Sequence, residues 1–145
     1  SLAVTVMDII KLRGTEKKLY ELIAPLTLNP AILRQNNNYP FKTGIKYVWY
    51  VAADKEQVFG FMPVKQTSTD CYLLDNYYIK GDDSVVLNML LTEVLANVNR
   101  QETLSAVVHK RHSELFRQKK FRVHIEWKNY ERMLYCPGRV QAERI

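Results

Sequence analysis

The chain has 145 residues, of which 47% are hydrophobic and 25% are charged, close to the averages of soluble globular proteins. Its length predicts one domain over residues 1–145, with a folded core over residues 7–135 and a loosely held tail over residues 136–145. No apolar run approaches the roughly 18 residues of a membrane helix, and the first residues lack the pattern of a signal peptide. This composition argues against a disordered chain and a helical membrane protein, and a cytoplasmic location is expected.

The positive charge is concentrated in the last third of the chain. Residues 1–100 carry 11 basic and 10 acidic residues, whereas residues 101–145 carry 10 basic and 5 acidic, which is +5 of the net +6. Such an excess favours an anionic partner, such as a phosphate-bearing cofactor or nucleic acid, while a solvated basic face is the simpler interpretation. Cys71 and Cys136 have no CxxC spacing, so they predict neither a zinc cluster nor a disulfide framework and are expected to be reduced.

Hydrophobic spacing and turn residues divide the chain into short alternating elements. In chain order, the predicted elements are a strand at residues 4–12, a helix around residues 19–23, a short helix from Pro30 to the polar run at residues 35–38, strands at 47–52, 57–63 and 71–79, a long helix at 84–99, a strand at 103–108, a short helix at 112–120, and strands at 121–127 and 130–135. Pro25 is expected to end or kink the first helix. Residues 40–46 are predicted to form a loop.

The long helix has the strongest pattern in the chain. Val86, Leu90 and Val94 repeat at four-residue spacing, with leucines beside them, and so wide an apolar stripe belongs against a sheet. The strands before this helix suggest a hairpin, and the elements after it suggest a strand, helix, strand crossover that ends in a second hairpin. The predicted fold class is therefore α/β, with a mixed sheet in a single domain.

Three short motifs accompany this order of elements. Residues 115–121 are similar to a helix that ends in an aromatic residue, a few polar residues and Gly-Phe, with Lys120 in place of the glycine. Residues 74–78 resemble the end of a fourth strand, and residues 89–91 the interior of a cofactor-binding helix, in the GNAT superfamily, which has the acyl-CoA N-acyltransferase fold. The resemblance covers about residues 7–135. It implies a divergent member with about seven strands, mostly antiparallel, a parallel pair splayed at the cofactor site, and about four flanking helices.

The resemblance implies an N-acetyltransferase that moves an acetyl group from acetyl-CoA, the acyl donor, to an amine that the sequence does not identify. The amine must lose a proton before it attacks, since alkylamines titrate near the lysine value of about 10.4. Asp75 is the preferred base, because its aromatic and aliphatic strand is expected to raise its pKa; exposure on the other face of the sheet is the alternative. A backbone N–H near Tyr77 or Tyr78 is expected to stabilise negative charge on the thioester oxygen.

The resemblance assigns candidate residues to two roles. The candidate catalytic residues are Asp75, Tyr78 and His109. The candidate cofactor-binding residues are Tyr77, Tyr78, Lys80, Gly81, Asp82, Asp83, Ser84, Val85, His109 and Phe116. His109 falls where the family often has an asparagine that faces the pantetheine arm of the cofactor. No metal site is predicted, because His109, His112 and His124 have no acidic or cysteine ligand at a fitting spacing nearby.

Two departures from the family pattern concern the cofactor. Phe116 occupies the position of a tyrosine that commonly protonates the departing thiolate, so Tyr77, Tyr78 or water would have to replace it. The turn at residues 82–87 lacks the glycines whose N–H groups receive the pyrophosphate. One carboxylate about 6 Å from a phosphate charge costs roughly 2.8 kcal/mol at an effective dielectric of about 20, or about a hundredfold in affinity. Alternatively, Asp82 and Asp83 only cap the long helix.

A second hypothesis is a GNAT-fold binding module that has lost acyl transfer and has an anionic or protein partner. A basic cluster suits the 3′-phosphate of CoA, and its members are Lys110, Arg111, Arg117, Lys119, Lys120 and Arg122. A nucleic-acid partner is disfavoured because no binding motif accompanies the cluster. A membrane is not expected as a partner, and a homodimer is left open. The transferase hypothesis requires a gap between neighbouring parallel strands and free amides at the start of the long helix; acidic side chains filling that start would count against it.

Overall fold

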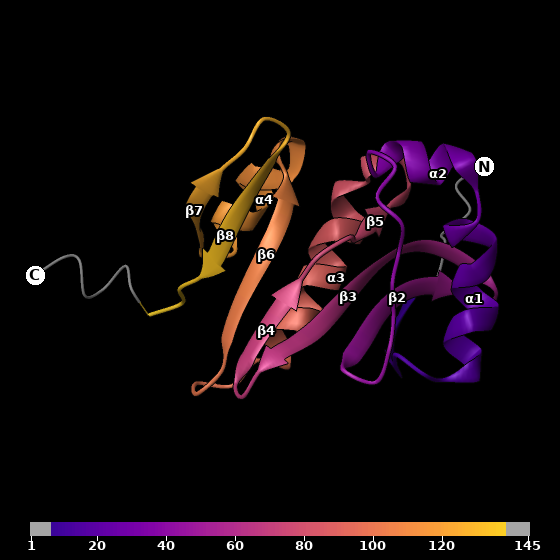
Figure 1. Ribbon diagram of the computed structural model, residues 1–145, viewed down its shortest axis with the longest axis horizontal. Coiled ribbons are helices and arrows are strands. Elements are labelled where there is room, and N and C mark those ends of the chain that lie inside the picture. The colour runs from indigo at the N-terminus through magenta and orange to yellow at the C-terminus, as the bar shows by residue number, and fades with distance from the viewer. Residues whose placement is uncertain (1–6, 139–145) are drawn as a thin grey trace, which may run out of the picture.

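The computed structural model describes residues 7–138. Its strands are β1 (Asp8–Arg13), β2 (Tyr47–Asp54), β3 (Gln57–Ser68), β4 (Cys71–Leu74), β5 (Tyr78–Ile79), β6 (Thr103–His109), β7 (Phe121–Glu126) and β8 (Tyr130–Tyr135). Its helices are α1 (Lys17–Thr27), α2 (Pro30–Gln35), α3 (Ser84–Ala96) and α4 (Ser113–Gln118), with 3-10 turns η1 (Lys80–Asp82) and η2 (Lys110–His112). The strands follow one another across a single twisted sheet (Figure 1).

The order of strands in this sheet is β1-β2-β3-β4-β6-β8-β7, with β5 paired to β3 beside this path. Among the described strands, β4 and β6 form a parallel pair and the remaining neighbours are antiparallel. Strand β6 follows α3 along the chain, so α3 is the crossover that a parallel connection needs. The predicted α/β class, with one mostly antiparallel mixed sheet and one parallel pair, is confirmed.

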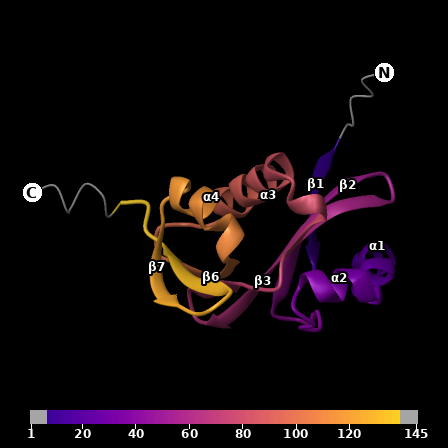
Figure 2. The same ribbon diagram turned by 90° about the horizontal axis from the view of Figure 1, so that it is seen from above.

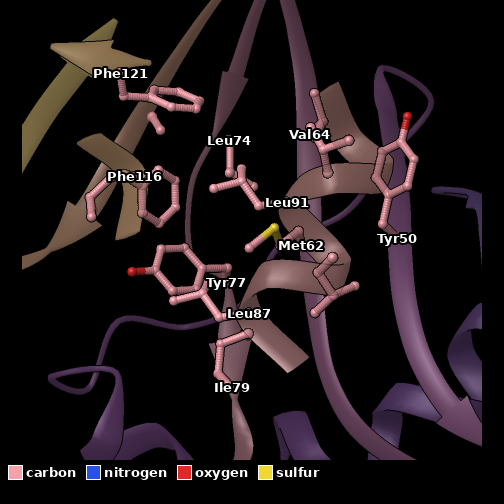
Figure 3. Close-up of a cluster of buried hydrophobic side chains, with 14 of the residues drawn as sticks. Tyr50, Met62, Val64, Leu74, Tyr77, Ile79, Leu87, Leu91, Phe116 and Phe121 are labelled. Carbon is pink, nitrogen blue, oxygen red and sulfur yellow. The ribbon is translucent and has the colours of Figure 1, made fainter. Parts of the chain in front are cut away.

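Helices cover the two faces of the sheet unequally. Figure 2 shows α3 and α4 on one face and α1 and α2 on the other. The cluster under α3 contains the buried Leu87, Leu90 and Leu91 (Figure 3), and the cluster under α1 contains Leu19 and Leu22. Alternate residues of β2 point into the two clusters, as the two-residue period of a strand requires. Burial on both faces therefore explains why residues 47–53 of β2 and residues 58–64 of β3 form continuous apolar runs.

The predicted strand at residues 71–79 is wrong in one respect, because the chain leaves the sheet between Leu74 and Tyr78. The Asp75 carboxylate accepts a hydrogen bond of 2.7 Å from the N–H of Asn76, whose φ is +53°. Aspartate and asparagine favour such local bonds, and asparagine tolerates this backbone region better than most residues. The Asp-Asn pair in the sequence is thus the physical cause of the interruption.

Several other boundaries also differ from the prediction. Helix α1 does not end at Pro25 but continues to Thr27, since a proline in the last turn removes only one N–H donor from the helix. Helix α3 ends at Ala96, three residues before the predicted end at residue 99. Helix α2 begins at Pro30, as predicted, and Asn29 caps it by accepting the N–H of Ala31 at 2.9 Å.

Parts of two predicted segments, residues 4–6 of the first strand and residues 139–145 of the tail, lie outside the described residues. Between residues 7 and 138, none of the helices is both long enough and apolar enough to span a membrane.

Candidate active site

Strands β4 and β6 pair at one end and separate at the other. Residues 71–74 of β4 pair in register with residues 103–106 of β6. Beyond that point β5 pairs with β3, whereas β6 pairs with β8. The chain after β4 therefore diverges from β6 toward the end that carries the β5 label in Figure 1. The interruption after Leu74 allows this divergence, because it detaches the chain from β6 before pairing with β3 resumes.

Tyr77 occupies the space between the separating strands. Only 2% of this residue is exposed, and its ring centroid lies 5.8 Å from that of Phe116 (Figure 3) and 5.2 Å from that of His109. The backbone N–H of His109, at the end of β6, donates a hydrogen bond of 3.1 Å to the Tyr77 hydroxyl. A side chain from the interruption therefore bridges the strands where their backbones no longer meet.

A chain of hydrogen bonds continues from Tyr77 to the start of α3. The Tyr77 hydroxyl lies 2.7 Å from Nδ1 of His112, and Nε2 of His112 lies 2.8 Å from Oδ1 of Asp82. The carboxylate can only accept, so Nε2 carries the proton and Nδ1 accepts from the tyrosine. The arrangement fixes one neutral tautomer of His112 and leaves the buried polar groups of Tyr77 and His112 with partners.

Acidic side chains occupy the start of α3. Asp83 caps the helix, because its Oδ1 accepts the N–H groups of Val85 at 2.9 Å and Val86 at 3.3 Å. Asp82 is not a cap; its Oδ1 accepts from Nε of Arg111 at 3.0 Å. The predicted alternative of a helix cap thus holds for Asp83, and the amides that the transferase hypothesis requires to be free are satisfied within the chain.

These contacts leave a small cavity, which we call the mouth. It is lined by Gln35, Asn36, Tyr77, Tyr78, Ile79, His109, Arg111 and His112, and its volume is about 10 Å³. That volume is at the lower limit for a single water molecule. The start of α3 lies beside the mouth, because Asp82 contacts the lining residues Arg111 and His112. The N–H groups of Val85 and Val86 can bind a phosphate there only after Asp83 has moved.

Burial and charge shift the titration of the groups around the mouth. Burial, followed by the positive charge of Arg111 and the neighbouring His112, lowers the pKa of His109 from 6.5 to about 4. Burial also lowers the pKa of His112, against the opposing effect of Asp82. Partial burial raises the pKa of Asp82, but the hydrogen bonds from Arg111 and His112 outweigh it, so this pKa lies below its ordinary value. Both histidines are therefore neutral and Asp82 is ionised near pH 7.

A much larger pocket lies on the sheet face opposite α3. Its volume is about 640 Å³, and its lining includes Lys42, Lys65, Asp75, Trp127 and Tyr130. This volume is within the usual range for sites that bind small molecules. Burial raises the pKa of the Asp75 carboxyl, and the hydrogen bond from the N–H of Asn76 opposes part of that rise. We call this cavity the large pocket.

The loop after α2 lies between the mouth and the large pocket. Nδ2 of Asn36 is 3.4 Å from Oδ1 of Asn76, and Nδ2 of Asn37 donates at 2.7 Å to the hydroxyl of Tyr130 on β8. The rings of Tyr130 and His109 lie 4.6 Å apart between centroids. The two cavities are therefore neighbours, separated by side chains from the loop, the strand interruption and the ends of β6 and β8.

The structure divides the candidate residues between these cavities. Asp75 lines the large pocket, whereas Tyr77, Tyr78 and His109 line the mouth. Tyr78 is also packed against Phe61, with ring centroids 5.6 Å apart. Asp75 and the other two candidate catalytic residues, Tyr78 and His109, are thus not gathered around one cavity.

The remaining cofactor candidates surround the start of α3. Gly81 has a φ of +62° and open space where a Cβ would lie. Ser84 and Val85 are exposed. Nζ of Lys80 lies 5.8 Å from the centroid of the Phe59 ring, so Arg111, rather than Lys80, provides the cation next to Asp82. Phe116 is fully buried behind Tyr77.

The predicted basic cluster is partly neutralised by its own neighbours. Lys110 pairs with Glu126 at 2.7 Å, and Arg117 lies 3.6 Å from Glu131 and 3.8 Å from Glu114. His124 is exposed on β7, while the rings of His109 and His112 are 5.7 Å apart. In the stretch from residue 7 to residue 138, no group of three histidine, cysteine or acidic residues is placed to hold a metal ion.

The sequence pattern does not reveal residues whose contacts join distant segments of the chain. The sequence indicates His112 only as a candidate metal ligand and Arg111 only as a member of the basic cluster, yet both contact Asp82, about 30 positions away. Lys42 and Lys65 carried no motif, and the fold brings them to one pocket. The His-Lys-Arg-His run at the end of β6 was the available signal for the mouth; for Lys42 there was none.

No family model matches the chain, and no curated protein matches it in sequence. Solved structures do match. The N-acetyltransferase PseH of Campylobacter jejuni, in complex with acetyl coenzyme A, is 17% identical, with a TM-score of 0.58 over 92% of this chain and 100% of that one. An acyl-CoA N-acyltransferase of Pseudomonas aeruginosa is 10% identical, with a TM-score of 0.69 over 90% and 100%.

The PaiA N-acetyltransferase of Thermoplasma acidophilum, in complex with coenzyme A, is 14% identical, with a TM-score of 0.56 over 89% of this chain and 98% of that one. Each of these proteins is aligned over nearly its whole length. The chain described here therefore has the acyl-CoA N-acyltransferase fold.

Proposed function

We propose that this protein transfers an acetyl group from acetyl-CoA to an amine, with the acyl donor at the mouth and the amine in the large pocket. The observation that carries the proposal is the separation of β5 from β6 beyond residues 74 and 106, directly beside a pocket of about 640 Å³. Solved proteins of the same fold have been described in complex with acetyl coenzyme A and with coenzyme A. A likeness of fold alone does not identify a reaction, so the proposal depends on what the residues can do.

Acetyl-CoA supplies an activated acetyl carbon, to which the amine nitrogen forms a bond as the carbon–sulfur bond breaks. In this proposal Asp75 accepts the proton that the amine must lose, directly or through water. It lines the large pocket, and its raised pKa makes it a better base than an exposed aspartate. His109 is not the preferred base, because burial lowers its pKa from 6.5 to about 4 and its Nδ1 lies 3.3 Å from Nη1 of Arg111.

The backbone at Tyr77 and Tyr78 is proposed to stabilise the negative charge that develops on the acetyl oxygen. The departing sulfur also requires a proton, and Phe116 has none to give. The hydroxyl of Tyr77 already donates to Nδ1 of His112, and burial raises its pKa, so a water molecule is the proposed substitute. Departure as a thiolate is an additional route, since a thiol with a pKa near 8.5 is a moderate leaving group at neutral pH.

Binding of a phosphate at the start of α3 requires that Asp82 and Asp83 move, and each contact that they lose has a cost. Loss of a helix cap such as Asp83 costs about 1 kcal/mol. The Arg111–Asp82 pair is more than 40% exposed on each side, so breaking it costs at most about 1 kcal/mol. Movement of Asp82 also removes the acceptor from Nε2 of the buried His112, which costs about 1–3 kcal/mol. Together these costs reduce affinity by at least about a hundredfold. Arg111, once free of Asp82, presents a guanidinium group that can bind a phosphate in its place.

Thermal unfolding with and without ligand tests donor binding. Acetyl-CoA at about 100 times its dissociation constant should stabilise the protein by about 2.7 kcal/mol, or roughly 8 °C for a chain of this size. Adenosine 3′,5′-bisphosphate, which has no pantetheine arm, is the matched control and should give a smaller shift. Acetyl transfer is then measured as free thiol released from acetyl-CoA in the presence of a panel of amines, with Asp75→Asn expected to slow release at least tenfold.

The occupied start of α3 favours a second candidate function, a binding module with an anionic or protein partner and no acyl transfer. The two candidates differ in a measurable way. If millimolar acetyl-CoA raises the unfolding temperature of neither the protein nor an Asp82→Asn variant, the transferase proposal fails and the binding module replaces it. A higher unfolding temperature in both proteins, with thiol release in neither, would also overturn the proposed acetyl transfer.

A further inference from the structure

The large pocket contains two cations that have no carboxylate partner. Lys42 and Lys65 both line it and are exposed. In the described part of the chain, neither lysine lies within 4.0 Å of a carboxylate oxygen. The ammonium group of Lys65 is instead 5.8 Å from the centroid of the Tyr47 ring. Both charges are therefore available to an anionic ligand.

The same pocket contains one carboxylate at a defined distance along the sheet. Lys65 on β3 is directly opposite Leu73 on β4. Asp75 lies one residue beyond the end of β4, diagonal to Lys65, where its N–H still donates to the carbonyl of Pro63 at 3.4 Å, and both residues line the same pocket. Diagonal positions of this kind are about 7–8 Å apart between backbones. Asp75 lies next to the strand separation, whereas Lys65 points toward the Tyr47 side of the pocket.

Aromatic side chains provide flat apolar walls between and around these charges. The pocket lining includes Tyr39, Tyr47, Trp127 and Tyr130. Trp127 is 45% exposed and Tyr39 is 56% exposed, so both rings are accessible to a ligand in the pocket. The pocket thus combines a negative end, a positive end and aromatic walls, which complements a ligand of the opposite polarity.

We infer that the ligand of the large pocket is an amine that also carries an anionic group, a carboxylate or a phosphate, with a flat or apolar part between the two. The ammonium end is directed to Asp75 and the anion to Lys65 and Lys42. As an account of the acetyl acceptor this inference rests on the proposed function, whereas the binding of such a ligand does not depend on acetyl transfer.

A rigid set of probes tests the binding step. The probe is 4-(aminomethyl)benzoate, and its matched controls are 4-(aminomethyl)benzamide, which lacks the anion, and 4-methylbenzoate, which lacks the amine. A phosphonate in place of the carboxylate distinguishes the two anions. Binding is followed by the fluorescence of Trp127, and loss of the signal in Trp127→Phe confirms the location. The amine-carboxylate or amine-phosphonate should bind at least tenfold more tightly than either control, and less tightly at high salt.

Lysine variants assign the anion site. Lys65→Gln and Lys42→Gln should each weaken the anionic probe about fivefold and leave the benzamide unchanged. Lys46→Gln is the control, because Lys46 is an exposed lysine in the same segment that lines a different cavity. Equal binding of probe and benzamide, or an equal effect of Lys46→Gln and Lys65→Gln, would overturn the inference.

Acetylation of the same compounds, measured by mass spectrometry, separates the two proposals. Binding of the probe without any acetylated product overturns the proposed function and leaves the ligand class supported. Acetylation of the benzamide as fast as of the anionic probe supports the proposed function and overturns the inference. Faster acetylation of the anionic probe, lost in Lys65→Gln but not in Lys46→Gln, supports both.

Discussion

The mouth and the large pocket are neighbours on one sheet, but the chain satisfies their polar groups very differently. At the mouth, Asp82, Arg111, His112 and Tyr77 are joined by hydrogen bonds of 2.7–3.0 Å, and almost no volume remains. In the large pocket, two lysines have no carboxylate partner among the described residues and about 640 Å³ is open. The polar groups around the mouth therefore contribute to folding stability, whereas those of the large pocket are free to contribute to ligand binding.

The pH dependence of stability should reveal the mouth most strongly. His109 has a pKa of about 4 in the folded protein, against an ordinary value of 6.5, so the unfolded chain binds more protons between these pH values. Stability is therefore full above pH 6.5 and is lost as pH falls toward 4, by about 3 kcal/mol. His112, whose pKa is also lowered, acts in the same direction.

Urea unfolding measured at intervals between pH 7.5 and pH 4 checks this expectation. The groups that face His109 are Arg111, His112, Asp82 and the rings of Tyr77 and Tyr130. Asp82, with its lowered pKa, titrates below the window, and Tyr77, with its raised pKa, titrates above it. His109→Gln should reduce the slope of stability against pH in this window. A slope that is the same in the variant would show that His109 is not buried in its neutral form.

Removal of a tyrosine hydroxyl should lower the free energy of unfolding much more at the mouth than in the large pocket. Tyr77→Phe leaves the N–H of His109 and Nδ1 of His112 without their shared partner, and buried unsatisfied groups cost 1–3 kcal/mol, so we expect a loss of about 2 kcal/mol. Tyr39→Phe, in the large pocket, is the matched control and should change stability by less than about 0.5 kcal/mol. Urea unfolding of both variants provides the comparison, and equal losses would contradict it.

Opening of the mouth should alter ligand affinity by a smaller amount. Asp82→Asn removes a negative charge and weakens the hold on Arg111, so affinity for acetyl-CoA should rise about tenfold, equivalent to about 1.4 kcal/mol. Asparagine tolerates the φ of +52° at this position. Asp70→Asn is a suitable control, because Asp70 is exposed and has a φ of +59°. Calorimetric titration that finds unchanged or weaker binding in Asp82→Asn would refute the proposed conflict between Asp82 and phosphate.

The fold was largely predictable because local patterns carry it. The four-residue spacing of Val86, Leu90 and Val94 matches the burial of this face of α3 in the core. The hairpins follow from strand runs separated by polar turns. The boundaries that were wrong depend on finer balances. Asp75 and Asn76 prefer a local bond to strand pairing, and Pro25 falls in a last helical turn where its missing N–H matters little.

The candidate site was less predictable because its contacts join distant segments. The resemblance indicates the start of α3 as a phosphate site. The sequence leaves open whether its two aspartates repel a phosphate or only cap the helix. Which choice applies depends on Arg111 and His112, which follow Asp82 by about 30 positions. The large pocket draws on the loop before β2 and on β3, β4, β6 and β8, and no local pattern reports such convergence.

The weakest expected effect concerns the loop that separates the two regions. The hydroxyl of Tyr130 accepts a hydrogen bond of 2.7 Å from Asn37 and the ring of Tyr39 packs on that of Tyr130 at 6.2 Å. The bond is exposed, so Tyr130→Phe should lower stability by only about 0.5 kcal/mol. Hydrogen exchange in residues 37–46 should nevertheless become faster, because this bond is one of the few that tie the loop to β8. Tyr20→Phe, an exposed tyrosine on α1, should leave exchange in this loop unchanged, and equal exchange in the two variants would show that packing of the rings, rather than the hydrogen bond, holds the mouth and the pocket apart.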